Sequence, residues 1–409
     1  MKKDLASLME AEGLDAVLIL GSSRHNPDMY YFTGGVHITS GALVLKRGSP
    51  GILFCHSMER DEAAQTGLRV EIFEPFTQLL ELTGGDRKQA QSLRMRRVLE
   101  RAGVVAGRVA VGGRADLGMV VEVFPDLQRH LPDLVISGLK TDSVIRQAMA
   151  TKDKDEIERI RRMGKVTVEV VGSIADFLTS HRAKDGVLVK GDGEPLTIRE
   201  VKRRINLELA ERGAENTHGT IFAAGRDGAV PHSAGTDDSP VPLGQAIVFD
   251  LFPCEEGGGY YYDFTRTWCL GHAPDGVQDL YQDVLEVYGQ VVDQLEPGGL
   301  CSSYQDLTCD LFEAREHVTV RVDPETEDGY THAIGHGLGL NVHELPNFGE
   351  MATEKDVLTP GVVFTIEPGL YYPDLHTGVR LEDTYYVGED GRIEKLADYP
   401  LDLVLPVAG

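Results

Sequence analysis

Apolar and polar positions follow two different periods along the first 140 residues, and their alternation predicts alternating helices and strands. Helical periodicity covers residues 3–14 and 89–103. Short apolar runs bounded by glycine or charged residues predict strands over 15–21, 41–47, 51–55 and 108–113. Helices alternating with strands are typical of an α/β layer structure.

The pattern changes near residue 150. A charged stretch leads into a long amphipathic helix within residues 146–178, and further helices are predicted at 197–213, 276–295 and 303–317. A polar segment, 181–197, interrupts the helices, and strand-like segments follow residue 245. With a length of 409 residues, this predicts two domains, 1–150 and 151–409, of mixed α/β (α+β) class.

Residues 245–268 have two β-rich arms around an acidic, glycine-rich middle, which is the pattern of an antiparallel hairpin. We expect its tip at Glu256 and Gly257. Asp250 and Asp263 are thirteen positions apart and equally far from that tip. Symmetric pairing would therefore place these two carboxylates opposite each other.

A second predicted hairpin, residues 361–387, repeats the arrangement with its tip near Asp374, and Glu367 and Glu382 are about equally far from that tip. Four carboxylates on apolar strands are costly to bury unless they are protonated or neutralised. Two divalent cations would balance four charges, and oxygen ligands favour Mn, Co, Zn or Mg. The pattern alone leaves open that these acids are solvated strand or turn residues.

The segment 332–344, HAIGHGLGLNVHE, adds candidate nitrogen ligands. His332 and His336 have the spacing of a helical HExxH zinc site, but Ala333 follows His332 where that motif has glutamate. Three glycines also disfavour a helix. We therefore predict a strand over 336–344, in which the glycines let the backbone pass close to the metals.

Composition narrows the classes of function. The chain has 40 basic and 65 acidic residues, a net charge of -25, which repels nucleic acids and anionic membrane surfaces. It has no apolar run long enough to span a membrane and does not begin like a signal peptide. Five cysteines without a CxxC pair predict free thiols. We therefore expect a cytoplasmic protein without nucleic acid or membrane partners.

The segments IVFDLFP, YYYDFTRTW, HAIGHGLGLNVHE, TIEPGLYY and VRLEDTYYV resemble, in order, those of the pita-bread metallopeptidase family, which includes methionine aminopeptidase, prolidase, aminopeptidase P and creatinase. The segment HNPDMYYFTG resembles the N-terminal domain of the prolidase, aminopeptidase P and creatinase branch. The resemblance implies an N-terminal creatinase-like α/β domain, followed by a catalytic domain with a curved antiparallel sheet.

The resemblance also implies a ligand set for two divalent metal ions, Mn, Zn or Co. Asp250 and Asp263 would bind the first metal, Asp263 and Glu382 would bridge, and His336 and Glu367 would complete the second site. The interval between the aspartates is thirteen, where the family usually has eleven. An insertion of two residues at the hairpin tip would keep the side-chain parity of the strands.

Further residues take roles from the same resemblance. His343 would hydrogen-bond the scissile carbonyl oxygen, and His232 would lie near the leaving side of the substrate. His332 resembles an additional pocket histidine, and Glu367 would carry a proton from the attacking water to the leaving nitrogen. For Arg380, pairing with a substrate carboxylate and supporting a ligand are equally good interpretations.

The implied reaction is hydrolysis of the bond before proline in a small peptide with proline at the second position, by a bridging hydroxide on a dinuclear centre. We favour an Xaa-Pro dipeptidase. The alternatives are an Xaa-Pro aminopeptidase on longer peptides, metal-free creatine hydrolysis, and a non-catalytic binding protein. Relatives complete the site across a dimer, so we expect a homodimer in which Arg24 or His37 reaches the partner's site.

Overall fold

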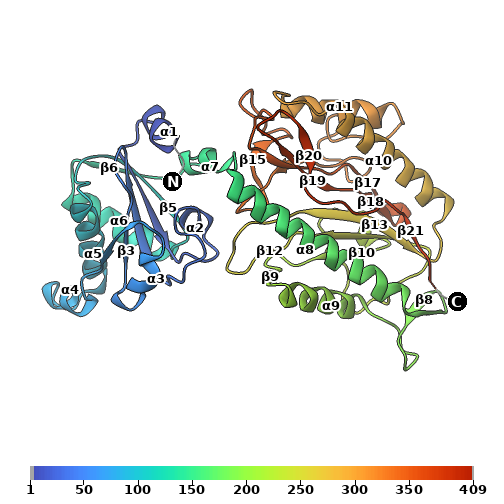
Figure 1. Ribbon diagram of the computed structural model, residues 1–409, viewed down its shortest axis with the longest axis horizontal. Coiled ribbons are helices and arrows are strands. Elements are labelled where there is room, and N and C mark those ends of the chain that lie inside the picture. Colours follow the sequence, from blue (N-terminus) through green and yellow to red (C-terminus); the bar gives the residue numbers. More distant parts are fainter. Residues whose placement is uncertain (1–3, 408–409) are drawn as a thin grey trace. The chain divides into compact units, whose positions relative to one another are not determined.

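The structure is a computed structural model and describes residues 4–407 (Figure 1). Cα packing divides the chain into two units. The first runs to Met149 and also takes in Gly257–Gly259, and the second begins at Ala150 and contains the rest. No helix within residues 4–407 is both long and apolar enough to cross a membrane.

The first unit is built on a six-stranded mixed sheet in the order β4-β3-β2-β1-β5-β6. Pairing is antiparallel for β1–β2 and β2–β3 and parallel for β3–β4, β1–β5 and β5–β6. The strands are β1 (Ala16–Gly21), β2 (Gly41–Lys46), β3 (Ile52–Cys55), β4 (Arg69–Ile72), β5 (Gly107–Gly113) and β6 (Leu134–Gly138). The four strands predicted from the apolar runs are thus confirmed.

Within residues 4–149 seven α-helices accompany this sheet, and two of them, α1 and α5, were predicted. They are α1 (Leu5–Ala11), α2 (Pro27–Thr33), α3 (Arg60–Ala64), α4 (Phe76–Leu82), α5 (Arg87–Arg101), α6 (Leu117–His130) and α7 (Val144–Met149). The helical period of α6 was missed because Pro125 lies inside it.

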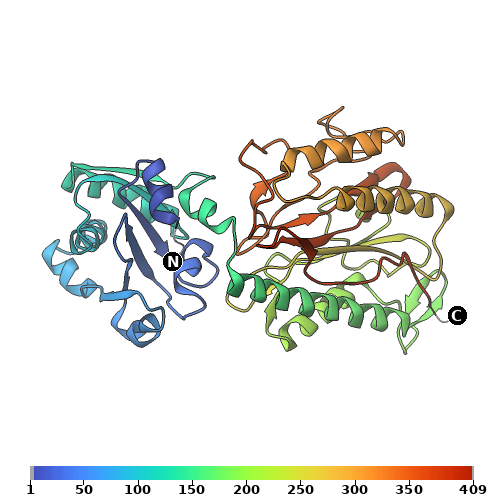
Figure 2. The same cartoon turned by 45° about the horizontal axis from the view of Figure 1, so that its top comes forward.

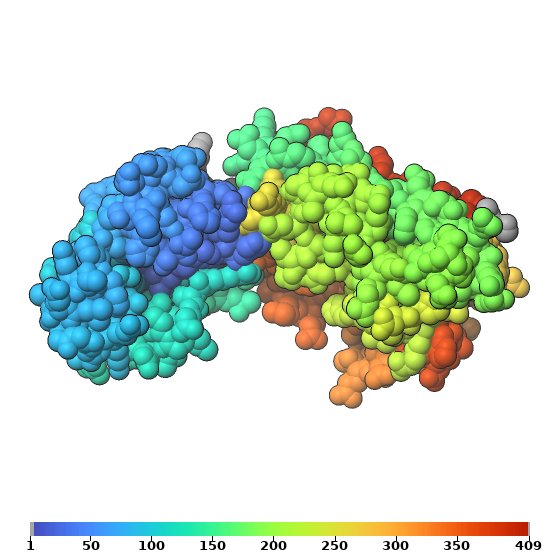
Figure 3. All heavy atoms as spheres, turned by 90° about the horizontal axis from the view of Figure 1, so that it is seen from below, coloured from blue at the N-terminus to red at the C-terminus, as the bar shows by residue number. Residues whose placement is uncertain are grey.

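The second unit contains the four helices predicted for it: α8 (Lys154–Thr179), α9 (Ile198–Glu211), α10 (Asp275–Asp293) and α11 (Cys301–Glu313). In Figure 2, α8 and α9 lie on one side of the sheets, and α10 and α11 lie on the other. The polar segment 181–197 forms a small hairpin of β7 (Arg182–Lys184) and β8 (Val187–Val189). Residues 190–240, green to yellow-green, occupy much of the face of this unit seen in Figure 3.

The sheets of the second unit are mainly antiparallel, which agrees with the predicted catalytic domain. One has the order β10-β11-β13-β21, another the order β15-β14-β16-β19-β20, and β17–β18 and β12–β9 form two-stranded pairs. The strands are β9 (Ala214–Glu215), β10 (Ile221–Ala224), β11 (Ala246–Leu251), β12 (Cys254–Glu255), β13 (Phe264–Leu270), β14 (His336–Gly337), β15 (Glu344–Asn347), β16 (Val363–Ile366), β17 (Gly369–Tyr372), β18 (Thr377–Arg380), β19 (Asp383–Val387), β20 (Ile393–Lys395) and β21 (Val404–Leu405). Buried side chains of α10 and α11 pack on β16, β17 and β19.

The register of the first hairpin differs from the symmetric pairing expected. Asp250 pairs with Thr265, so Asp263 lies two residues before that partner, toward the turn, and is not directly opposite Asp250. The turn is centred one residue later than expected, at Gly257 and Gly258, whose φ angles of 87° and 80° favour glycine. A one-residue shift of the tip displaces the pairing by two residues, which keeps both aspartates on the same face.

The strand predicted over 336–344 is wrong, because only His336–Gly337 is extended and the next strand begins at Glu344. Two glycines of this region are explained by contacts with neighbouring backbone, and their expected closeness to the metals stays a prediction. A Cβ on Gly335 would lie 2.0 Å from the Thr365 carbonyl oxygen, and a Cβ on Gly337 would lie 2.1 Å from that of Leu345. These glycines therefore permit close approach to neighbouring backbone segments.

Candidate metal centre

The two carboxylate-bearing hairpins meet at Thr265 and Glu382. The amide of Glu382 donates to the carbonyl oxygen of Thr265 at 3.0 Å. The Thr265 hydroxyl also donates to Oε2 of Glu382 at 2.8 Å. The strand pairing on either side joins Ile366 with Asp383 and Gly369 with Arg380. The same register, continued between them, places Glu367 opposite Glu382. The sheet register thus brings the acids of both hairpins to one place.

Asp263, His336 and Glu382 each offer a ligand atom within 4.8 Å of the others, and they are the only such group of three within residues 4–407. Nε2 of His336 is 3.7 Å from Asp263 Oδ2 and 3.3 Å from Glu367 Oε1. Nδ1 of His336 lies 3.0 Å from the carbonyl oxygen of Gly337. A proton on Nδ1 would satisfy that carbonyl and leave Nε2 as a free electron-pair donor, as in many metal sites.

The donor set fits divalent cations. Oδ1 of Asp250 and Oε1 of Glu382 are buried and have no hydrogen-bond partner. Without a cation, burial and the neighbouring Asp250 raise the pKa of Glu367 to about 8, against an opposing effect of Arg380. Burial and neighbouring carboxylates likewise raise the pKa values of Asp263 and Glu382. Ionised carboxylates at this density need positive charge, which metal ions supply.

Asp250 lies beside this group and is engaged by Arg380. Nη2 of Arg380 donates to Oδ2 of Asp250 at 2.6 Å, and Nη1 donates to the Tyr371 hydroxyl at 2.7 Å. That hydroxyl lies 2.9 Å from Nε2 of His332. Arg380 is buried, so these contacts favour the interpretation in which it supports a ligand. Its pairing with a substrate carboxylate stays a prediction.

Burial, followed by the charge of Arg380, lowers the pKa of His332 to about 4, so its imidazole is neutral at pH 7. Its Nδ1 is 2.8 Å from the carbonyl oxygen of Ala333, which assigns the proton to Nδ1. Nε2 then accepts a hydrogen bond from the hydroxyl of Tyr371. The arrangement fixes the orientation of this ring beside the candidate metal ligands.

The ring of His343 packs against that of His336, with the ring centroids 4.2 Å apart. Burial lowers the pKa of His343, and the nearby His232 and His218 lower it further. The structure therefore places both His232 and His218 near His343. His218 is exposed, and its Nε2 lies 3.3 Å from the hydroxyl of Tyr261.

Sequence reasoning missed three side chains of this site: Thr265, Tyr371 and His218. The first two could have been found from the alternation of side chains along a strand, because residues an even number apart point to the same face. Thr265 is two residues after Asp263, and Tyr371 is four after Glu367. His218 had no such signal, since it lies in a loop outside the strands that carry the candidate ligands. Arg24 and His37 lie in the first unit, and their expected role across a dimer stays a prediction.

Two family profiles match the chain. Metallopeptidase family M24 matches residues 158–389, and the Creatinase/Prolidase N-terminal domain matches residues 2–148. Among curated proteins, the chain is 26% identical to an Xaa-Pro dipeptidase of Pyrococcus furiosus over 95% of this chain and 94% of the relative. It is 25% identical to an Xaa-Pro dipeptidase of Pyrococcus horikoshii over the same shares.

Solved structures share the fold over nearly the whole chain. A dipeptidase from Pyrococcus horikoshii has a TM-score of 0.76 at 21% identity and covers 98% of this chain and 99% of its own. An X-Pro aminopeptidase from Thermotoga maritima has a TM-score of 0.73 at 21% identity and covers 97% and 99%. The match to family M24 covers more than half of the chain and includes every candidate ligand. The protein therefore belongs to metallopeptidase family M24, a peptidase family that uses divalent metal ions, and carries a creatinase/prolidase N-terminal domain.

Proposed function

We propose that this protein is an Xaa-Pro dipeptidase that depends on two divalent ions, Mn, Zn or Co. The observation that carries the proposal is the group of Asp263, His336 and Glu382, in which both carboxylates are buried, together with the unpartnered oxygens of Glu382 itself and of the neighbouring Asp250. The two Pyrococcus relatives named Xaa-Pro dipeptidase, similar over about 95% of this chain, support the choice of substrate.

The five residues Asp250, Asp263, His336, Glu367 and Glu382 would hold the ions. When bound, the ions lower the pKa of water and polarise the scissile carbonyl. Glu367 would also take the proton of the attacking water and pass it to the leaving nitrogen, which is the acid–base role of a carboxylate beside the reacting atoms.

The histidines would bind and orient the substrate. His343 donates a hydrogen bond to the carbonyl oxygen as negative charge develops there. His232 lies near the leaving side, and the neutral His332, held by Tyr371, lines the proline pocket. A dedicated pocket is needed because proline has no N–H for a general peptidase to bind and its φ is fixed.

The test is product analysis by mass spectrometry. The purified protein, loaded with Mn(II) or Zn(II), is given an equimolar mixture of Leu-Pro and Leu-Pro-Gly, with a chelator-treated sample as control. We expect loss of Leu-Pro alone, and only with metal. If neither peptide is cleaved, the peptidase proposal for these substrates fails.

The second candidate is an Xaa-Pro aminopeptidase, because the Thermotoga maritima X-Pro aminopeptidase fits the fold about as well as the dipeptidases. Release of leucine from Leu-Pro-Gly would favour it.

The proposed metal content and the expected homodimer are tested separately. Metal analysis of the loaded protein should give two ions per chain. Light scattering should give the mass of a homodimer, and a monomer with full activity would exclude site completion by Arg24 or His37 of a second copy.

A further inference from the structure

Lys152 and Glu344 form a buried ion pair although 192 positions separate them in the sequence. Nζ of Lys152 lies 2.8 Å from Oε2 of Glu344, and the two side chains are 1% and 4% exposed. Charges are buried in this way only when each has a partner, because an unpaired buried charge is strongly destabilising. Neither residue is among the candidate ligands or the histidines around them.

The other oxygen of Glu344 closes the turn between β14 and β15. Oε1 accepts hydrogen bonds from the backbone amides of Leu340 at 2.8 Å and Asn341 at 3.0 Å. This turn, residues 338–343, ends at His343. One carboxylate therefore joins the ammonium group of Lys152 to the backbone of the loop that carries His343.

The pair also fixes this loop relative to His336. Glu344 is paired in the sheet with Gly337, the residue after His336. A Cβ on Gly339 would lie 2.3 Å from Glu344 Oε2 and 2.8 Å from Cε of Lys152, so the loop packs directly onto the ion pair. The first hairpin is attached to the same place, because the amide of Tyr261 donates to the carbonyl oxygen of Gly339 at 2.8 Å.

The backbone of Lys152 is fixed by a hydrogen bond and by the helix that follows it. Its amide donates to the carbonyl oxygen of Gly361 at 2.7 Å, shortly before β16. The next residue, Asp153, is the N-cap of the 26-residue helix α8 and forms a capping box with Glu156. An unpaired cation at a helix N-terminus is unfavourable, so Lys152 has a further reason to keep its anionic partner. In Figure 1, β15 lies beside the beginning of α8.

We propose that Lys152 and Glu344 are positioning residues that hold the loop 338–343, and with it the imidazole of His343, against His336. They do not contact the substrate. The inference rests on the proposed function in one respect, namely that His343 donates a hydrogen bond to the scissile carbonyl oxygen. Loss of the pair should impair the use of that hydrogen bond in the transition state more than it impairs substrate binding.

The first test measures the loop without using activity. Hydrogen exchange of the Leu340 and Asn341 amides is followed in the metal-loaded full chain. We expect Lys152→Met to exchange at least ~10-fold faster than wild type, because the unpaired carboxylate of Glu344 leaves the interior and releases both amides. Lys152→Arg should stay within about 3-fold of wild type, since it keeps the cation.

The matched control is Lys190→Met. Lys190 pairs with Glu200 at 2.9 Å, and Glu200 belongs to the capping box of α9. The control therefore removes a Lys–Glu pair at another helix start whose side chains are 33% and 36% exposed. It should leave the exchange of Leu340 and Asn341 unchanged. Unchanged exchange in Lys152→Met, or equal acceleration in Lys190→Met, overturns the proposal.

The second test separates kcat from KM on Leu-Pro. Lys152→Met should lower kcat by about 100-fold with KM within about 3-fold, because misplacing a catalytic group by ~1 Å costs that much. The double variant Lys152→Met/Glu344→Gln, which leaves no unpaired charge, should lose less than the product of the two single losses. A change in KM alone, or multiplicative losses, would contradict a positioning role for the pair.

Two further outcomes distinguish failure of the proposed peptidase function from failure of the proposed role of the Lys152–Glu344 pair. If wild type cleaves neither test peptide, the proposed function fails, and the exchange measurement alone decides the role of the pair. If Lys152→Met does not fold, Glu344→Gln replaces it as the test variant. Glutamine keeps an oxygen that can accept from both amides but loses the negative charge that pairs with Lys152. The exchange of Leu340 and Asn341 in that variant should then lie above wild type, and wild-type protection would count against the pair.

Discussion

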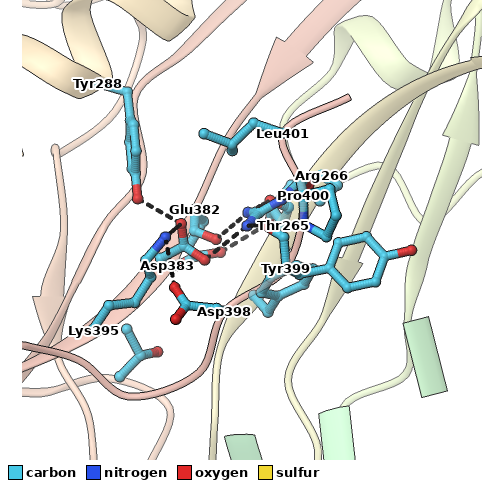
Figure 4. A network of polar contacts seen from close by, with 12 residues as sticks. Thr265, Arg266, Tyr288, Glu382, Asp383, Lys395, Asp398, Tyr399, Pro400 and Leu401 are labelled. Atoms are coloured by element: carbon cyan, nitrogen blue, oxygen red, sulfur yellow. Dashed lines mark hydrogen bonds and ion pairs between the residues drawn. The ribbon is translucent and has the colours of Figure 1, made fainter. Parts of the chain in front are cut away.

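Arg266 and Asp383 form an ion pair in which both side chains are fully buried, with Nη2 of Arg266 2.9 Å from Oδ1 of Asp383 (Figure 4). Nη1 of Arg266 also donates to the carbonyl oxygens of Thr265 and Glu382, each at 2.9 Å. The guanidinium therefore binds the backbone of Thr265 and Glu382, whose side chains belong to the candidate centre. Carbonyl oxygens of Tyr399 and Pro400 accept its remaining hydrogen bonds.

Replacing Arg266 by methionine should lower the free energy of unfolding by roughly 3 kcal/mol, because the buried carboxylate of Asp383 loses its guanidinium partner and keeps only Lys395, whose Nζ lies 3.4 Å from Oδ2. Urea unfolding of the metal-loaded protein measures the change. The control is Arg392→Met, which breaks an exposed pair with Asp390 and should cost no more than about 0.5 kcal/mol. Equal losses in the two variants would refute the special role of the buried pair.

Replacing Thr265 by valine should weaken metal binding by ~10-fold, as is typical when a residue that supports a ligand is lost. The change removes the hydroxyl that donates to Glu382 Oε2 and orients that carboxylate. Competition with a metal chelator measures the affinity. Thr308→Val is a suitable control, since Thr308 is also buried but its hydroxyl donates to the Tyr304 carbonyl oxygen within α11.

Replacing His336 by alanine should remove most activity on Leu-Pro and reduce the metal content of the purified protein. The reason is that His336 is the nitrogen donor of the group with Asp263 and Glu382. Elemental analysis and a peptidase assay test both effects on the same sample. His130→Ala in α6 serves as the control, and wild-type metal content and activity in His336→Ala would disprove the assignment.

Removing the metal should make stability fall as the pH rises from about 6.5 to 8. Below about pH 6.5 the lowered pKa values of His332 and His336, about 4 and about 3, act in the opposite direction, because unfolded histidines are protonated there. The pKa of Glu367 is raised to about 8 in the folded chain, whereas an unfolded glutamate titrates near ~4.3. Between these values the folded state binds more protons than the unfolded state, so its relative stability decreases with increasing pH. The raised pKa values of Asp263 and Glu382 act in the same direction.

Thermal unfolding of chelator-treated and Mn-loaded protein over this pH range tests that expectation. The loaded protein should keep its melting temperature toward pH 8, because cations stabilise the ionised carboxylates. A chelator-treated protein whose melting temperature rises from about pH 6.5 to pH 8 would show that the carboxyl groups are not protonated in the folded state.

The sequence by itself determined most of the local structure and which residues are candidates for the centre. Helical periodicity located α5, α8, α9, α10 and α11, and apolar runs located β1, β2, β3 and β5. These patterns are local, because the spacing of the apolar residues on the buried face of a helix or strand can be read from a few consecutive residues. Strand parity likewise placed Glu367 opposite Glu382 and kept Asp250 and Asp263 on one face of their hairpin.

Only the tertiary structure decided the register of the first hairpin and the partners of the charged residues. Three adjacent glycines allow several turn positions, so the sequence did not distinguish pairing of Asp250 with Asp263 from its pairing with Thr265. The partners of Arg380 and Lys152, Asp250 and Glu344, are 130 and 192 positions away. No local period records such contacts, because they depend on how distant strands and helices pack against one another.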